Sequence, residues 1–365
     1  MTPPGRDLSL GSPTVASILE ENNGKGPGFD FLRLALALLI LFWHSFVLCN
    51  GMPWSIQTLH GPWRIFIFSL VPSFFALSGF LVAGSMVRTE RLRTFLLFRI
   101  LRIVPALVME TVLSAFVLGA WVTTLPLNKY FTSPEFTAYM LNIIGFVHFE
   151  LPGVFESNPW PRYVNFSLWT IPAELGCYTL LSVLMLAGIA KERVLLLMTF
   201  VLVTLMLALM GLGGFDTYTS FVVLSRPMLV CCFAAGNLFY LWRDRICLSP
   251  RLFAFSTVAF GLSIYYYYPL VFSVGAVSIT YITIYIGLMR IHKIPLLMRG
   301  DYSYGTYLYA YPIQQTVVWL FPALRQFYFV FLIAAPVTLL LAMFSWHLIE
   351  KPALTLKKRF ISASP

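Results

Sequence analysis

The chain has 365 residues, of which 59% are hydrophobic and only 11% are charged. This composition excludes an ordinary soluble protein and indicates an all-α polytopic membrane protein, whose core is the helix bundle itself. The formal net charge of +10 would suit a nucleic-acid partner, but the positions of the basic residues indicate membrane topology instead. We therefore expect membrane lipids around the protein and no nucleic acid.

Ten apolar segments have about the length of a membrane-spanning helix, and we expect them to form one transmembrane domain at 29–352. They cover residues 29–49, 65–87, 104–124, 167–189, 194–212, 220–241, 252–268, 270–289, 303–322 and 327–349. Residues 1–28 contain no apolar run, which predicts an N-terminal tail and no cleaved signal, and 353–365 form a second short tail. We expect the segment 136–148, which is too short to cross a bilayer, to lie in the interface or to re-enter.

The basic residues predict the orientation. Of the 25 lysine and arginine residues, nineteen fall on the side that carries both tails, four on the other side and two within spans. An excess of basic residues marks the cytoplasmic side, so both termini are predicted to be cytoplasmic. The longest loop, 125–166, then lies outside the cytoplasm.

The first span, FDFLRLALALLILFWHSFVLC, contains Arg33 and His44. They are eleven positions apart, which returns both to nearly one helix face, about 16 Å apart along the axis. Ionisable side chains in a membrane helix must face protein or water. His44 could simply be hydrogen-bonded in the bundle, but an imidazole also accepts and returns protons near neutral pH. We interpret the two residues as lining a polar path, with His44 toward the outer side.

Arg99 and Arg102 lie one turn apart in RTERLRTFLLFRILRIVP and share a helix face at the cytoplasmic surface. Such a pair is typical of a positive-inside anchor. Two guanidinium groups at this spacing would also bind a phosphate-bearing donor from the cytoplasm. The charge pattern alone leaves both interpretations open.

Two acids fall within apolar segments: Glu110 in the third and Glu174 in the fourth, within SLWTIPAELGCY. Glu174 lies at a depth similar to that of His44, so it could orient the imidazole or balance its charge. Arg226 in the sixth segment could pair with either acid. For Glu110 and Arg226 we expect pairing that stabilises the bundle.

Two further stretches contain small or aromatic residues. Ser78 and Gly79 in PSFFALSGFL favour close helix packing over exposure of backbone to a ligand. Polar and aromatic side chains in DYSYGTYLYAYPIQQ are typical of an interfacial aromatic belt: Ser303, Tyr304, Tyr307 and Tyr311. Neither the five cysteines nor the histidines show metal-ligand spacing, and His60, His148, His292 and His347 are interpreted as non-catalytic.

Taken together, six motifs resemble the integral-membrane acyltransferase family 3, the O-acyltransferases that modify bacterial surface glycans. The motifs are Arg33 with ten residues before His44, FFALSGFL at 74–81, FRILRIVP at 98–105, SLWTIPAELGCY at 167–178, SYGTYLYAYP at 303–312 and IEKP at 349–352. They occur in the family's order over most of the chain. The chain departs from the pattern at Ala310, where many members have histidine.

The resemblance implies transfer of an acyl group, usually acetyl, from cytoplasmic acyl-CoA to a hydroxyl outside the cytoplasm. The enzyme would lie in the bacterial cytoplasmic (inner) membrane, with acetyl-CoA as co-substrate and a glycan or lipid-linked saccharide as acceptor. In this pattern His44 matches the catalytic histidine, Arg33 its partner, and Arg99 and Arg102 the arginines tied to acyl-CoA use. We assign three further residues to binding of the acyl-CoA donor together with these arginines: Ser303, Tyr304 and Tyr307.

We therefore predict that His44 acts as the base on an acceptor hydroxyl, with Arg33 and Glu174 as further catalytic residues and no metal. A transient acyl-histidine is an alternative. The rival class is a proton-coupled transporter or flippase of a saccharide, in which Arg33, His44, Glu174 and Arg226 would form a relay. That class predicts two similar halves, which the sequence does not show. A receptor or scaffold for an envelope assembly is supported only by the loop 125–166.

Overall fold

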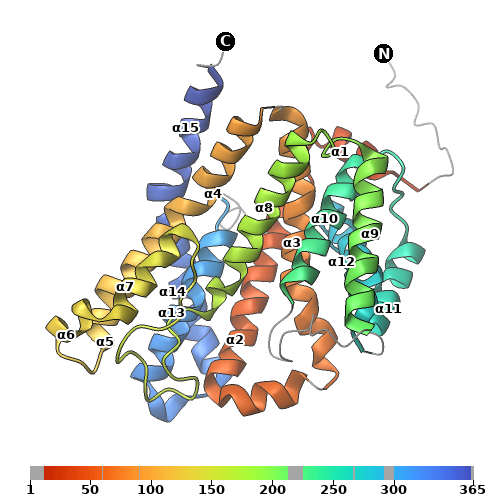
Figure 1. Ribbon diagram of the computed structural model, residues 1–365. Coiled ribbons are helices and arrows are strands. Elements are labelled where there is room, and N and C mark those ends of the chain that lie inside the picture. Colours follow the sequence, from red (N-terminus) through yellow and green to blue (C-terminus); the bar gives the residue numbers. More distant parts are fainter. Residues whose placement is uncertain are drawn as a thin grey trace, which may run out of the picture.

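A computed structural model of the chain describes residues 12–59, 61–89, 91–212, 225–265, 268–291 and 300–362, which form helices and no β-strand (Figure 1). The α-helices are α1 (Val15–Glu21), α2 (Phe29–Leu59), α3 (Trp63–Thr89), α4 (Leu92–Val112), α5 (Ala120–Val122), α6 (Leu127–Thr132), α7 (Pro134–Met140), α8 (Ile171–Leu186), α9 (Arg193–Leu212), α10 (Arg226–Leu241), α11 (Pro250–Tyr265), α12 (Val274–Leu288), α13 (Ser303–Leu320), α14 (Phe327–Ser345) and α15 (Lys351–Ser362). Shorter 3₁₀ and π segments are η1 (Leu113–Gly119), η2 (Leu141–Ile144), η3 (Phe166–Thr170), η4 (Tyr268–Phe272), η5 (Pro322–Leu324) and η6 (Trp346–Glu350).

Each of the ten predicted segments overlaps one of the longer helices, while residues 220–224 and 266–267 of these segments lie outside the described residues. Among the described residues, six helical stretches are long and apolar enough to cross a membrane, and α10 and α12 are apolar but shorter. The six are 29–59, 63–89, 92–122, 166–186, 193–210 and 327–356. The all-α membrane fold is confirmed, whereas ten crossings and cytoplasmic termini stay predictions.

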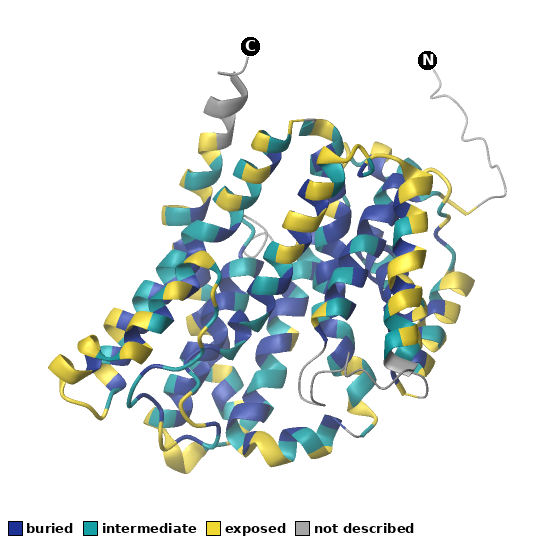
Figure 2. Ribbon diagram, in the orientation of Figure 1, coloured by how far each residue is buried: buried dark blue, intermediate teal, exposed yellow. Residues whose placement is uncertain are grey.

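The outer helices expose apolar side chains. On α9, Met198, Leu202 and Leu209 are 62%, 67% and 58% exposed (Figure 2). Leucine and methionine at such exposure would be unfavourable in water over a whole helix, but they suit contact with lipid. Polar groups are correspondingly buried inside the bundle, where the functional residues lie.

The first long helix, α2, packs between α13 and α3 and bends at Gly51. Gly51 has a positive φ of 79°, a conformation that glycine adopts without steric cost. A Cβ at this position would also lie 2.9 Å from the carbonyl oxygen of Pro159. The bend therefore ends the straight part of α2 a short distance after His44 and brings the loop 125–166 against it.

Helices α3 and α10 cross at very close range through glycine. A Cβ on Gly79 would lie 2.0 Å from the carbonyl oxygen of Phe233, and one on Gly236 would lie 2.1 Å from that of Ala76. Only residues without a side chain permit this approach. Gly79 therefore permits close packing of the two helices, as the sequence predicts.

The loop 125–166 folds into α6, α7 and η2, which lie together beside η1 and α5 (Figure 1). Ser133 caps α7 by accepting a hydrogen bond from the Phe136 amide at 3.1 Å, and Pro134 follows it in the first turn. The later part of the loop is tied to α13, because Nε2 of Gln315 donates to the carbonyl oxygens of Trp160 and Tyr163 at 2.9 and 2.8 Å. The loop is thus fixed against α13, which packs beside the helix that carries His44.

Candidate active site

The described residues enclose two neighbouring cavities. The larger, about 390 Å³, we call the arginine cavity, because Arg33, Arg88, Arg99 and Arg102 line it. The smaller, about 80 Å³, we call the histidine cavity, and its lining includes His44, Trp43, Trp160, Phe166, Trp169 and Tyr311. Val71 on α3 lines both, so the two cavities share a wall.

The arginine cavity brings together most of the residues that the sequence singled out. They come from α2, α3, α4, α8 and α13 and comprise Arg33, Ser78, Arg99, Arg102, Glu174, Ser303, Tyr304 and Tyr307. Residues separated by more than two hundred positions therefore meet in one place. The serine and tyrosines of α13 face the arginines of α4 and do not form an aromatic belt at the membrane surface.

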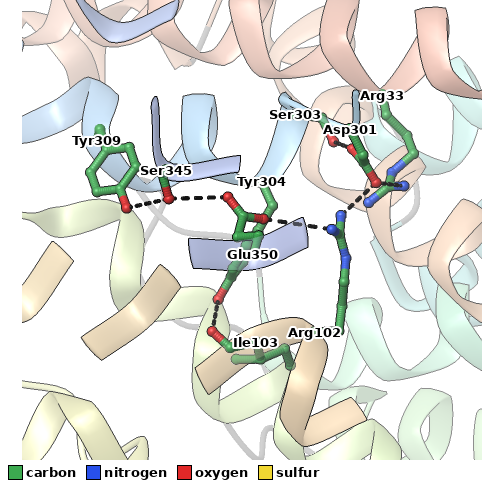
Figure 3. A network of polar contacts seen from close by, with 9 residues as sticks. All are labelled: Arg33, Arg102, Ile103, Asp301, Ser303, Tyr304, Tyr309, Ser345 and Glu350. Atoms are coloured by element: carbon green, nitrogen blue, oxygen red, sulfur yellow. Dashed lines mark hydrogen bonds and ion pairs between the residues drawn. The ribbon is translucent and has the colours of Figure 1, made fainter. Parts of the chain in front are cut away.

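Asp301, immediately before α13, joins two of the arginines (Figure 3). Its Oδ2 pairs with Arg33 and lies 2.6 Å from Nη2 of Arg102, while its Oδ1 accepts from the Ser303 hydroxyl at 2.6 Å. Burial by itself would raise the pKa of Asp301, but the charges of Arg102 and Arg33 and the Ser303 hydrogen bond lower that pKa below its usual range. The carboxylate is thus held ionised between two guanidinium groups.

The polar chain continues from Arg102 through Glu350, whose Oε2 lies 3.6 Å from Nη1 of Arg102 (Figure 3). Oε1 of Glu350 accepts from Ser345, which in turn accepts from the Tyr309 hydroxyl. Sequence reasoning missed Asp301 and Glu350 as site residues. Both nevertheless lie at stretches that carry the family resemblance, because Asp301 is two residues before SYGTYLYAYP and Glu350 is within IEKP.

Arg99 is held differently from Arg33 and Arg102. Its Nη2 lies 3.3 Å from the Ser85 hydroxyl, and its guanidinium lies 5.8 Å from the ring centroid of Tyr178. No carboxylate pairs with Arg99 or with Arg88 among the described residues. Asp301 and Glu350 are engaged by the other two arginines, and the lining contains four arginines against one acid, Glu174, so positive charge is in excess in this cavity.

Glu174 lines the arginine cavity and accepts a hydrogen bond from the Tyr178 hydroxyl at 2.6 Å. No hydrogen bond joins it to His44 in the part of the chain that the structure describes. The interpretation that Glu174 orients the imidazole is therefore wrong for this conformation. The acid belongs to the arginine side of Val71.

His44 is half-buried at the histidine cavity, and its ring meets Tyr311 edge-on with centroids 5.2 Å apart. Its Nδ1 is buried and has no hydrogen-bond partner among the described residues. The adjacent turn of α2 is fixed by Gln314, whose Nε2 donates to the Leu41 carbonyl and the Ser45 hydroxyl, both at 2.7 Å. Hydrogen bonds to the neighbouring turn thus hold the backbone at His44, while Nδ1 of the imidazole is left without a partner among the described residues.

The remaining predicted residues lie away from both cavities. Glu110 is fully buried, and its Oε1 accepts from Ser114 and Asn165 at 2.8 Å each. Asn165 also donates to the Leu308 carbonyl at 2.9 Å, so this cluster joins α4, η3 and α13. Arg226 is exposed at the first residue of α10 and forms no ion pair with a described acid, so the expected pairing with Glu110 or Glu174 is wrong.

Ala310, where many family members have histidine, packs against Leu41 and Ala335 and lines neither cavity. The departure therefore lies at a contact between α2, α13 and α14. Among the described residues, no group of three or more histidine, cysteine or acidic side chains is arranged to hold a metal ion.

A bundle with helices long and apolar enough to cross a membrane, and with a cationic cavity beside a histidine, defines the class as a multi-pass membrane protein. Residues 27–347 match the model of a family described as an acyltransferase domain, and the chain belongs to this family, the acyltransferase family 3 that its motifs resemble. The match covers most of the chain. The family prediction is confirmed, and the protein is an acyltransferase.

Two relatives are similar over nearly their whole length. An O-acetyl transferase of Shigella phage Sf6 is 27% identical over 340 residues, covering 90% of this chain and 96% of the relative. Nodulation protein 10 of Rhizobium leguminosarum bv. viciae is 27% identical over 387 residues, covering 94% and 97%. No solved structure matches the chain.

Proposed function

We propose that the protein is an O-acetyltransferase of the bacterial inner membrane that moves an acetyl group from cytoplasmic acetyl-CoA to a hydroxyl of an extracytoplasmic glycan. The acceptor would be of the exopolysaccharide or lipopolysaccharide type, free or lipid-linked. The observation that carries the proposal is the shared wall at Val71, which places a cationic cavity next to a histidine cavity. The phage relative named as an O-acetyl transferase supports the acetyl group.

The arginine cavity supports the assignment of the donor. Coenzyme A carries several phosphate charges, and guanidinium groups bind phosphate through short, charge-assisted hydrogen bonds. Arg88 and Arg99 have no carboxylate partner among the described residues and are therefore available for such bonds. Ser303, Tyr304 and Tyr307 line the same cavity and would contact the remainder of the donor.

His44 is the proposed base. A sugar hydroxyl is a poor nucleophile near neutral pH, so a positioned base is needed to accept its proton as the oxygen attacks the thioester carbonyl. The thioester would pass Val71 to reach the imidazole, and the CoA thiolate would leave toward the arginine cavity. Arg33 lies in the arginine cavity, about 16 Å along α2 from His44, so its proposed role is at the donor and not at the imidazole.

The experiment is transfer of label from acetyl-CoA to membrane glycan by the protein purified in lipid. We expect transfer with the wild type and loss of transfer with His44→Ala, while His148→Ala, which alters an exposed loop histidine, transfers as the wild type does. Transfer at the wild-type rate by His44→Ala refutes the assignment of the base. Proton-driven saccharide uptake without any label on glycan supports the transporter instead.

A further inference from the structure

Three residues that line the histidine cavity each carry a buried polar side-chain atom without a hydrogen-bond partner. The atoms are Nδ1 of His44, Nε1 of Trp160 and the hydroxyl oxygen of Tyr311, each buried and unpartnered among the described residues. All three residues line this one cavity. Buried polar groups are normally hydrogen-bonded, because leaving one unpaired is unfavourable, so three at one cavity point to a ligand.

The two groups beside His44 are rigidly held. Trp160 is 3% exposed, and its carbonyl accepts from Gln315 on α13 at 2.9 Å. Tyr311 is 1% exposed, lies on α13 itself and is followed by Pro312. Helix α13 therefore carries Tyr311 and holds the backbone of Trp160, and such preorganisation is what stabilises a developing charge.

The chemistry of the Trp160 indole N–H and the Tyr311 hydroxyl indicates that both act as hydrogen-bond donors. An indole N–H can only donate, and a phenol hydroxyl buried without an acceptor is also free to donate. One oxygen that accepts two hydrogen bonds would satisfy both donors, whose residues line the cavity of the base.

We propose that the Trp160 indole N–H and the Tyr311 hydroxyl form the oxyanion hole of the acyl transfer. This inference rests on the proposed function. As the acceptor oxygen forms a bond to the thioester carbon, its proton passes to His44 and the carbonyl electron pair moves onto the carbonyl oxygen. The two donors stabilise that oxyanion. Its collapse restores the carbonyl and breaks the C–S bond, and the departing thiolate takes the proton from His44.

Tyr311→Phe and Trp160→Phe test the assignment, each in the full-length protein with labelled acetyl-CoA. We expect kcat to fall about 100-fold in each, as for loss of one oxyanion donor, with KM for donor and acceptor unchanged. The matched controls are Tyr163→Phe and Trp319→Phe, which make the same changes outside the cavity and should leave kcat at the wild-type value.

The melting temperature of Tyr311→Phe gives a second measurement. Because the Tyr311 hydroxyl has no partner, its removal should leave the melting temperature unchanged or raise it, although kcat falls. Slow hydrolysis of acetyl-CoA without acceptor should fall by the same factor, since water attack forms the same oxyanion.

An unchanged kcat in both variants overturns the inference. A raised KM for the acceptor with normal hydrolysis also overturns it, because that result would assign the two donors to the sugar. A fall in kcat accompanied by a lower melting temperature overturns it as well. A wild-type protein that transfers no label at all contradicts the proposed function itself, and the hydrolysis measurement distinguishes that failure from the failure of the oxyanion hole.

Discussion

Arg33 and Arg102 approach one carboxylate, Asp301, from helices that are far apart in the sequence. Arg99, one turn from Arg102, has no acid partner among the described residues. Residues of the same type and on the same helix face therefore have different roles: Arg102 is part of an internal ion-pair network, and Arg99 is available to a ligand. Two predictions follow at this scale.

Arg99→Ala should weaken donor binding. Charged hydrogen bonds contribute about 1.5–3 kcal/mol, so we expect Kd for acetyl-CoA to rise roughly tenfold or more. Arg99→Lys should recover only part of the affinity, because ammonium cannot bind phosphate in a bidentate manner. Titration calorimetry on the purified protein measures both. The control is Arg93→Ala, because Arg93 is an exposed arginine of the same helix outside the cavity. Equal effects of the two substitutions on Kd would mean that Arg99 is only a topology anchor.

Asp301→Asn should destabilise the fold in a pH-dependent way. Removing one partner of a buried ion pair leaves uncompensated charge, which costs about 3 kcal/mol. Because the folded pKa of Asp301 is lowered, its stabilisation is complete above about pH 4 and is lost as the pH falls toward the lowered pKa. The difference in melting temperature between wild type and variant should therefore be large at pH 7 and shrink in acid.

Asp244→Asn is the matched control, because Asp244 pairs with Arg193 at an exposed site, where ion pairs contribute little. A pH-independent difference for Asp301→Asn, or one equal to that of Asp244→Asn, would contradict the role assigned to the ion pairs.

At the scale of the element, the helices meet through a few close contacts that decide their spacing. The α3–α10 crossing depends on Gly79 and Gly236, and α3 also carries Ser78 and Val71 at the two cavities. A change in the spacing of this pair would therefore alter the wall between the cavities as well as the core.

Gly79→Ala should separate α3 from α10. The added methyl group would lie 2.0 Å from the Phe233 carbonyl oxygen, so backbone must move, and we expect a loss of about 1–3 kcal/mol of stability together with reduced transfer. Gly176→Ala is the control, because a Cβ there meets nothing within 4 Å and alanine favours the helix. Thermal unfolding of both variants compares them, and equal melting temperatures would contradict the packing role.

At the scale of the whole molecule, the sequence predicted the helices well because apolar runs of spanning length have few alternatives. It also predicted most of the arginine cavity, through charged or polar residues that are unfavourable in a membrane. It missed Asp301 and Glu350 because a charge at a helix end looks solvent-exposed until its partner is known, and Arg102 lies 199 residues from Asp301.

Trp160 was not singled out from the sequence, and Tyr311 was interpreted only as part of an aromatic belt. Aromatic residues are common throughout this chain, and only the structure shows which of them line the cavity of His44 with an unpartnered donor. Arg226 is the opposite case, since a basic residue assigned to a span proved to be exposed at a helix start. Apolar length thus predicts elements, whereas the partners of polar side chains depend on tertiary packing.

The central claim is that a thioester bound in the arginine cavity reaches His44 past Val71. Val71→Trp, compared with Val71→Ala, tests it most directly, by acetyl-CoA binding and label transfer measured on the same purified samples. The account predicts that Val71→Trp binds acetyl-CoA with nearly wild-type Kd but transfers about 100-fold more slowly, because a misplaced thioester cannot meet the base, while Val71→Ala stays active. Transfer by Val71→Trp at the wild-type rate would contradict it.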